Sequence, residues 1–220
     1  MDPLDSQLRF LYAADKLKTV LRQSPLTDRS RRENSAEHSW HVALMALVLA
    51  GHAPPGADPG RAMAMLLIHD LVEVDAGDLF VYADEAAQAR QEKAERAAAD
   101  RLFGLLPPGQ DAGLRALWDE FEERATPDAK FARALDRLQP MLINMVTGGG
   151  TWAAHGITAD QVLRRVALIE DGSPGLGEYA RGMISRALAE GILAPAPDSG
   201  PAAGAPGGPS AAGPAGTDSR

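Results

Sequence analysis

The chain has 220 residues, of which 45% are hydrophobic and 24% charged. This composition predicts a single globular domain with enough apolar material for one core. With 22 Lys and Arg against 30 Asp and Glu, the net charge of −8 argues against binding to nucleic-acid polymers. The absence of Cys excludes disulfides, zinc-thiolate sites and thiol nucleophiles, so His and carboxylates must hold any metal ion.

The two ends of the chain are unlike the middle. No apolar run approaches the roughly 20 residues that span a bilayer, and residues 1–5 do not resemble a secretion signal, so we expect a cytoplasmic protein without a membrane segment. In residues 194–220, 20 of 27 residues are Ala, Pro or Gly, and none is Leu, Ile, Val or aromatic. Such a segment cannot bury enough apolar surface to offset the entropy lost on ordering. We predict a folded domain over 1–193 and a disordered tail over 194–220.

Within 1–193, apolar residues recur at helical spacing and strand-like alternation is almost absent, which predicts an all-α protein. The first helix is expected over about 6–22. The second begins after Asn34 or Ser35, with Ser35 a candidate N-cap, and the third covers about 59–74. Further helices are expected over about 84–106, 114–124, 127–146, 158–170 and 177–190. Thr126 and Pro127 are suited to the cap and first turn of the helix at 127–146.

The chemical information is concentrated around the five His residues. His69 and Asp70 follow a strongly apolar run, where a buried carboxylate needs a partner. Glu73 and Asp78 follow within nine residues, and carboxylates this close together repel one another unless protons or a cation separate them. We therefore favour a divalent cation over the alternative, in which His69 and Asp70 only bond to neighbouring backbone.

One helix does not supply enough ligands for a metal ion, and the best remote donors are His38 and Asp136. Asp136 lies among apolar residues, where an acid needs an explanation. It can alternatively pair with Arg133 or Arg137, which are close along the same helix. His41, three residues after His38, is either a further ligand or a packed core residue.

Three blocks of sequence carry these residues in order: RRENSAEHSWHVALMA at 31–46, LLIHDLVEVDAGD at 66–78 and AKFARALDRLQPML at 129–142. Over about residues 5–190 this H…HD…D pattern resembles the HD-domain metal-dependent phosphohydrolase superfamily, and within it the bacterial 5′-deoxynucleotidase-like branch. The resemblance implies an HD-domain helical bundle that holds one divalent ion, Mn²⁺, Co²⁺ or Mg²⁺. The implied ligands are His38, His69, Asp70 and Asp136.

The resemblance also implies roles for residues around the ion. In similar proteins the acids that match Glu73 and Asp78 lie in the same pocket, as general base, second-metal ligand or substrate contact. Of these two catalytic candidates, Glu73 is assigned as the general base and Asp78 is placed on the sugar side of the substrate. The arginine that orients the phosphate in the deoxynucleotidases aligns with Gln23, and Arg22 is one residue away. The remaining candidate substrate contacts are Leu79 and the arginines Arg29, Arg31 and Arg32, for which a solvated surface role is the stronger alternative.

The expected reaction is hydrolysis of a (deoxy)nucleoside 5′-monophosphate to nucleoside and phosphate, with Glu73 taking the proton. One alternative is a two-iron HD-type oxygenase, which needs further His ligands after the HD pair, where only His155 remains. The other is a non-catalytic nucleotide-binding regulator, which the presence of all four ligands and Glu73 disfavours. The expected binding partner is a small phosphorylated substrate. Related proteins are often dimers, so a homodimer is also considered.

Two tryptophans lie in segments whose composition suggests a role for them. In the segment 147–156, Trp152 and His155 either form a lid over the pocket or belong to a loop packed on its own helices. Trp118 lies in the acidic run WDEFEER. We interpret it as a residue that packs helices together rather than as a ligand contact.

Overall fold

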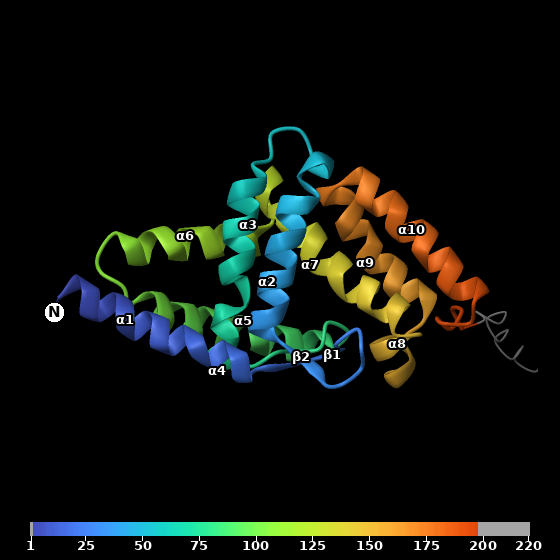
Figure 1. The fold of residues 1–220 in the computed structure, drawn as a ribbon, viewed down its shortest axis with the longest axis horizontal. Coiled ribbons are helices and arrows are strands. Elements are labelled where there is room, and N and C mark those ends of the chain that lie inside the picture. The colour runs from blue at the N-terminus through green and yellow to red at the C-terminus, as the bar shows by residue number, and fades with distance from the viewer. Residues whose placement is uncertain (1, 198–220) are drawn as a thin grey trace, which may run out of the picture.

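Helices make up most of the computed structural model, which describes residues 2–197 (Figure 1). They are α1 Pro3–Ala14, α2 Ser35–Val48, α3 Pro59–Ile68, α4 Glu73–Ala76, α5 Glu85–Phe103, α6 Gln110–Glu123, α7 Pro127–Val146, α8 Gly150–Ala154, α9 Ala159–Gly172 and α10 Pro174–Ala189. Short 3₁₀ helices lie at Asp15–Thr19, Ala50–His52 and His69–Val72. The predicted all-α class is confirmed, with one small sheet added to it.

That sheet replaces the end of the first predicted helix. α1 stops at Ala14, and after a 3₁₀ turn the chain forms β1, Leu21–Pro25, which pairs antiparallel with β2, Arg32–Asn34. The prediction of helix through residue 22 is wrong because the helical apolar spacing continues into this segment while the backbone has become extended. The pairing of β1 with β2 is irregular between Leu21 and Pro25, and Arg22, Gln23 and Ser24 all line one cavity.

The helix starts follow capping chemistry. At α7, the Thr126 side chain accepts a hydrogen bond from the backbone N–H of Ala129, as predicted. At α2, Asn34 is the N-cap instead of Ser35, and it exchanges hydrogen bonds with Glu37 in a capping box. Ser35 is the first helical residue, so its hydroxyl is available for another partner.

The third predicted helix is divided. α3 ends at Ile68, the residues His69–Val72 tighten into a 3₁₀ turn, and α4 follows. Another difference is the short helix α8, which begins at Gly150, the last of the glycines at residues 148–150, where we expected only a break. Residues 198–220 of the predicted tail lie outside the described residues. Of the rest, the carbonyl of Ala194 accepts a hydrogen bond of 2.9 Å from Ala159, so ordered contacts extend one residue past the predicted domain end.

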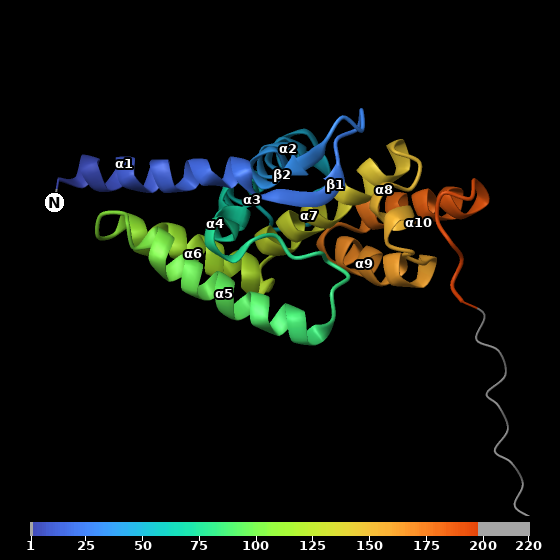
Figure 2. The same cartoon turned by 90° about the horizontal axis from the view of Figure 1, so that it is seen from below.

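α7 runs through the centre of the larger apolar cluster. Figures 1 and 2 show it between the pair α2 and α3 and the pair α9 and α10, and it contacts all four helices. Phe131 and Leu135 of α7 are fully buried there. A close approach of α9 depends on Gly172, because a Cβ at this position would lie 2.1 Å from the carbonyl oxygen of Lys130.

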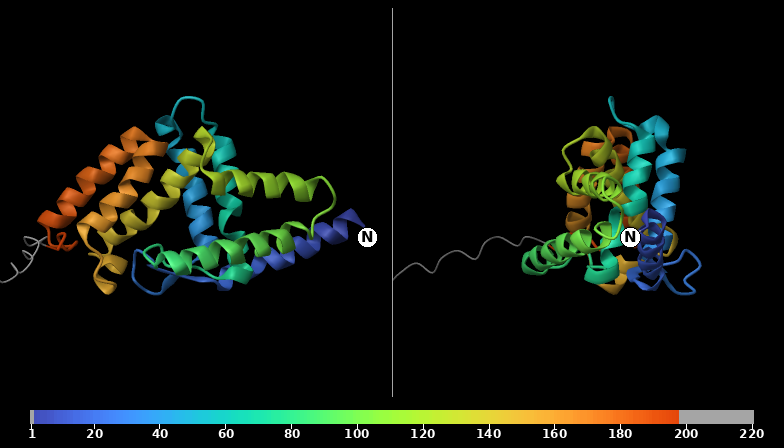
Figure 3. Two further views of the ribbon diagram at one scale, coloured as in Figure 1. Left: turned by 180° about the vertical axis from the view of Figure 1, so that it is seen from behind. Right: turned by 90° about the vertical axis from the view of Figure 1, so that its left-hand side faces the viewer.

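A smaller apolar cluster joins α1, α5 and α6, which extend from one end of the molecule (Figure 3). Trp118 of α6 is buried in it, and its ring N–H donates to the carbonyl of His69 at 3.1 Å. The interpretation of Trp118 as a packing residue is therefore consistent with its position. None of the helices among residues 2–197 is long and apolar enough to cross a membrane.

Candidate metal centre

Three elements distant in sequence bring His38, His69 and Asp136 together in the interior. They come from α2, the 3₁₀ turn after α3, and α7. One ligand atom of each lies within 4.8 Å of the others, and within residues 2–197 no other set of His and acidic residues meets this condition. His38 Nε2 lies 3.1 Å and His69 Nε2 lies 3.7 Å from Asp136 Oδ1. All three side chains are buried.

The hydrogen bonds behind the two imidazoles fit a metal ion. His69 Nδ1 lies 2.8 Å from the carbonyl oxygen of Leu66, and His38 Nδ1 lies 3.2 Å from the amide oxygen of Gln139. Both oxygens are acceptors, so Nδ1 carries the proton in each ring and Nε2 is left with a lone pair. Two lone pairs and the carboxylate oxygen of Asp136 then face one another in a buried space. His69 Nε2 has no hydrogen-bond partner, so this donor set calls for a cation.

Asp70 joins the same group. Its Oδ1 lies 3.0 Å from His69 Nε2, while its Oδ2 accepts a hydrogen bond of 2.8 Å from Arg22. The carboxylate is thus held by one oxygen and presents the other to the cluster. The structure brings together all four of the residues expected as ligands.

Asp136 has the surroundings of both a metal ligand and an ion-pair partner, because its two oxygens have different neighbours. Oδ1 faces the histidines, while Oδ2 lies 3.6 Å from Arg133 and 3.8 Å from Arg137. Burial alone would raise the pKa of Asp136, but the charges around it, above all that of Arg137, outweigh burial and hold this pKa well below its usual range. The side chain is therefore a carboxylate at neutral pH.

The pKa values of the two histidines shift in opposite directions. Burial, with the nearby charge of Arg22, lowers the pKa of His38 to about 4. Burial acts on His69 in the same direction, yet Asp70 and Asp136 outweigh it and raise the pKa of His69. A proton and a metal ion therefore compete for the space between these carboxylates.

Glu73 and Asp78 line the same cavity, next to the cluster. The hydroxyl of Ser35 donates to Glu73 Oε2 at 2.5 Å. Burial and the charge of Asp70 raise the pKa of Glu73 well above its usual range. Gly77, with a φ of 76°, ends α4 in a conformation that favours glycine, and the chain then turns so that Asp78 reaches the cavity.

The phosphate contacts expected near the N-terminus are arranged differently from the sequence prediction. Arg22 is nearly buried among acids, with its Nη1 bonded to Asp70 and lying 4.0 Å from Glu73 and 3.8 Å from Asp78. Although burial favours the neutral form, these carboxylates raise the pKa of Arg22. Gln23 and Leu79 line the cavity.

Arg31 does not reach this cavity. It is an exposed residue whose guanidinium pairs with Glu37 on the outside of α2. The structure therefore gives Arg31 the surface role that was its alternative interpretation.

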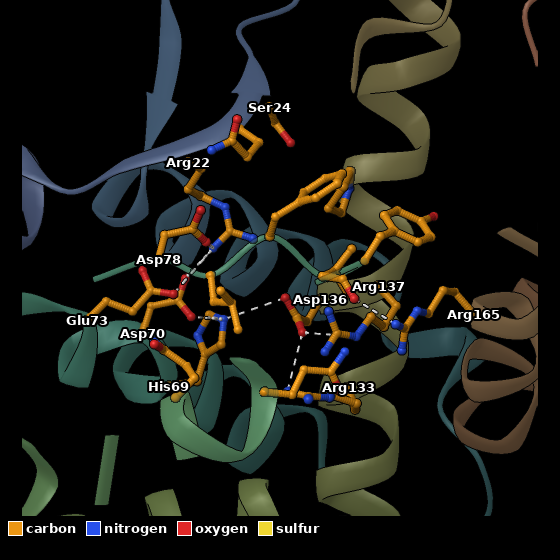
Figure 4. Close-up of a pocket in the computed structure, with 18 of the residues that line it drawn as sticks. Arg22, Ser24, His69, Asp70, Glu73, Asp78, Arg133, Asp136, Arg137 and Arg165 are labelled. Atoms are coloured by element: carbon orange, nitrogen blue, oxygen red, sulfur yellow. Dashed lines mark hydrogen bonds and ion pairs between the residues drawn. The ribbon is translucent and has the colours of Figure 1, made fainter. Parts of the chain in front are cut away.

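The cavity in front of the cluster has a volume of about 250 Å³. Opposite the acids, its wall contains residues that the sequence analysis did not place there (Figure 4). On that wall they are the arginines Arg133, Arg137 and Arg165. The aromatic residues Phe80 and Tyr82 also line the cavity. Arg133 and Arg137 had a detectable signal, since they flank Asp136, but Arg165 had none. Burial and the charges of Arg133 and Arg165 lower the pKa of Arg137 to about 9.

Trp152 also lines the cavity and is buried. The backbone N–H groups of Thr151 and Trp152 donate to the side-chain oxygen of Asn144, which ties α8 to α7. His155 is exposed and lies against Phe80, with 4.4 Å between ring centroids. These contacts match the packed alternative for this segment, with Trp152 as part of the cavity wall.

Behind the cluster, Gln139 and Glu33 form a second layer that the sequence analysis missed. The amide nitrogen of Gln139 donates to Glu33 at 2.8 Å, which fixes its oxygen toward His38. Burial raises the pKa of Glu33 to about 7. The available signals were weak: Glu33 belongs to the first sequence block, and Gln139 lies one helical turn after Asp136.

This helical fold and its buried His and Asp cluster define a protein with a metal site inside a helical bundle. The model of the HD domain family matches residues 14–176. The chain therefore belongs to the HD domain family.

The chain is also similar to several named proteins. The chain is 29% identical over 140 residues to the 5′-deoxynucleotidase HDDC2 of Danio rerio, covering 63% of this chain and 68% of the relative. It is 32% identical over 135 residues to a 5′-deoxynucleotidase of Erwinia tasmaniensis, covering 57% and 68%. A solved structure from Magnetospirillum magnetotacticum, described as a predicted metal-dependent phosphohydrolase, has 53% identity and a TM-score of 0.83. It covers 89% of this chain and 100% of that one.

Proposed function

We propose that this protein is a metal-dependent phosphomonoester hydrolase that converts a (deoxy)nucleoside 5′-monophosphate to nucleoside and phosphate. One observation carries this proposal. His38, His69 and Asp136 lie together in the interior, and the atoms that they direct toward one another are all hydrogen-bond acceptors. The relatives from Danio rerio and Erwinia tasmaniensis, both named 5′-deoxynucleotidases, support the substrate class. The cavity of about 250 Å³ suits a small molecule rather than a polymer.

We infer that the ion is held by His38, His69, Asp70 and Asp136. Two imidazole nitrogens and two carboxylate oxygens suit Mn²⁺ and Co²⁺ at least as well as Mg²⁺. When bound, such an ion lowers the pKa of water toward neutrality and polarises the phosphoryl oxygen.

The remaining steps belong to side chains of the chain itself. Glu73 is held at Oε2 by Ser35, and we assign it the proton of the attacking water. As the water oxygen bonds to phosphorus, the bond from phosphorus to the 5′ oxygen breaks, and the proton on Glu73 is available to that leaving oxygen. Asp78 is assigned to the sugar, and Phe80 and Tyr82, with ring centroids 5.3 Å apart, offer apolar surface to the base.

The two alternatives receive less support. A two-iron oxygenase needs additional His ligands, but His155 is exposed and lies against Phe80 rather than in the cluster. A non-catalytic regulator has no need of a buried Glu73 beside a complete ligand set.

The test is a phosphate-release screen of nucleoside monophosphates, diphosphates and other phosphate esters, each with Mn²⁺, Co²⁺ and Mg²⁺. We expect metal-dependent release from nucleoside 5′-monophosphates and none from the His38→Ala variant. Release from diphosphates or sugar phosphates with no release from nucleoside monophosphates would overturn the proposed substrate. Release that survives chelation of the metal would overturn the chemistry.

We also propose that a second copy of the chain covers α2. All four exposed residues of this helix are apolar, namely Trp40, Leu44, Leu47 and Val48, with exposures of 63%, 40%, 64% and 71%. They recur at the spacing of one helical face, and such a continuous apolar face marks an interaction surface. The cytoplasmic location expected from the sequence remains a prediction.

A further inference from the structure

The cavity contains arginines with two different kinds of surroundings. Arg22, on the acidic side, lies within 4.0 Å of Asp70, Glu73 and Asp78. Its charge is therefore balanced by the acids around it, and it already donates a hydrogen bond to Asp70. A substrate phosphate that approached Arg22 would have to compete with these carboxylates and would be repelled by them.

On the opposite wall, Arg165 has no such balance (Figure 4). Its Nη2 donates to the backbone carbonyl of Val81 at 2.6 Å, and its guanidinium lies 5.6 Å from the ring centroid of Tyr82. Among residues 2–197 it has no carboxylate partner within 4.0 Å. The backbone carbonyl and the ring orient the guanidinium while leaving its positive charge in the cavity.

Arg137 lies next to Arg165 on this wall and is also incompletely satisfied. Its Nε is 3.8 Å from Asp136 Oδ2, which is too far for a hydrogen bond, and this buried nitrogen has no other partner. The Nε of Arg133 is buried without a partner as well. Asp136 cannot satisfy both arginines, because one of its oxygens faces the metal ligands.

A phosphoryl group would supply what this wall lacks. Its oxygens accept the paired N–H groups of a guanidinium, and buried donors without partners are costly. A phosphomonoester carries close to two negative charges at neutral pH, whereas a phosphodiester carries one. Asp136 and Glu122, which lies 3.9 Å from Arg133, do not balance three arginines. The remaining positive charge of the wall therefore favours the monoester.

We propose that Arg137 and Arg165, with Arg133 beside them, bind the phosphoryl group of the substrate and select phosphomonoesters over phosphodiesters. The inference rests on the proposed function for the position of the metal and moves the phosphate contact away from Arg22. The phosphoryl group then lies between the metal ligands and the arginine wall, with Glu73 on the acidic side.

The test uses the full chain loaded with Mn²⁺, with inorganic phosphate as the probe. Arg165→Met and Arg137→Met should each weaken phosphate binding by at least tenfold in calorimetric titrations, while bound metal stays at the wild-type level. Arg137→Lys, which keeps the charge without the paired donors, should lie between the wild type and Arg137→Met. The matched control is Arg164→Met, because Arg164 directly precedes Arg165 on α9, is exposed and pairs with Asp160 at 2.8 Å.

Competition with inorganic phosphate separates the scissile phosphoryl group from other parts of the substrate. If the variants raise KM for a nucleoside monophosphate but leave inhibition by inorganic phosphate unchanged, the wall contacts another group and the inference is overturned. Phosphate affinities within twofold of wild type in both Met variants would also overturn it. A chain that binds phosphate through these arginines but hydrolyses no nucleoside monophosphate would support the wall and refute only the proposed substrate.

Selectivity supplies an independent measurement. The wild type should cleave p-nitrophenyl phosphate in preference to bis(p-nitrophenyl) phosphate, and Arg165→Met should reduce that preference at least tenfold. A preference unchanged by Arg165→Met would contradict the proposed role in monoester selection.

Discussion

Replacing Gln139 by Met should weaken metal binding although Gln139 touches no metal ion. Its amide oxygen lies 3.2 Å from His38 Nδ1 and holds the proton on that nitrogen. Without this acceptor, the ring can move its proton to Nε2 and donate to Asp136 Oδ1, 3.1 Å away. That arrangement satisfies the ligands without a metal ion, so a metal must break it.

The size of the effect follows from the hydrogen bond. Leaving His38 Nδ1–H buried without a partner costs about 1–3 kcal/mol in the metal-bound state. This energy corresponds to roughly 5–150-fold in affinity, which brackets the 10–100-fold loss typical of residues that orient a metal ligand. Because the ligands themselves remain, an excess of Mn²⁺ should restore most of the turnover.

Mn²⁺ dissociation constants for wild type and Gln139→Met, measured by calorimetry at one pH, provide the test. Gln88→Met is the matched control, because Gln88 lines the same cavity but bonds only to the carbonyl of Ala83. Circular dichroism establishes that each variant is folded. An affinity within twofold of wild type in folded Gln139→Met would refute the assignment of the His38 tautomer.

Three further predictions concern other parts of the molecule. Glu73→Gln should keep its metal and bind substrate yet slow turnover about 10²–10⁴-fold; turnover within a few-fold of wild type refutes the base role, and loss of a metal equivalent makes Glu73 a ligand. Burial raises the pKa of Glu95 to about 7, so its ionisation costs folding stability as pH rises from 4.5 toward 8. Glu95→Gln should therefore raise the melting temperature by a few degrees at pH 8 but not at pH 4.5, and equal shifts at both pH values contradict this. Leu47→Glu should convert a dimer to a monomer in light scattering, whereas Leu163→Glu, outside the α2 face, should not; a wild-type chain that is already monomeric excludes the dimer.

The ligand set could be predicted from the sequence because its members lie in apolar surroundings that make a charged residue conspicuous. His69 and Asp70 follow an apolar helix, and Asp136 lies between buried residues of α7. The helix at 127–146 was predicted with its correct bounds because Thr126 and Pro127 mark its start. Signals of this kind lie within a single segment of the sequence, so they can be recognised without knowledge of the tertiary contacts.

The strand β1 could not be predicted in the same way. It has five residues, LRQSP, with no apolar alternation, and it follows a segment with helical spacing. The consequence for the site is a change of register. In a helix, one residue is a rotation of about 100°, so the position of Arg22 was undetermined; in the strand, Arg22 reaches Asp70.

The arginine wall was hidden for a different reason. Its members come from α7 and α9. In the sequence, nothing distinguishes Arg165 from Arg164, the residue before it, and Arg133 and Arg137 can both be explained as ion-pair partners of Asp136. Only the packing of α9 on α7 turns Arg165 into the cavity and leaves Arg164 at the surface. Charge selection by this site is therefore a property of tertiary packing.

Asp136 connects the two halves of the cavity. The sequence offered a metal ligand and an ion-pair partner as alternatives, but its two oxygens fulfil one role each. The arginines near Oδ2 keep the carboxylate ionised even though it is buried, which is the state a metal ligand requires. If the same arginines bind the phosphoryl group, they balance the charge of Asp136 before the substrate arrives and that of the phosphate afterwards. Removing Arg137 should therefore weaken phosphate binding while Arg133, 3.6 Å from Oδ2, still lies beside Asp136. Bound metal should then stay at the wild-type level, which is why metal content must be measured in the same variant.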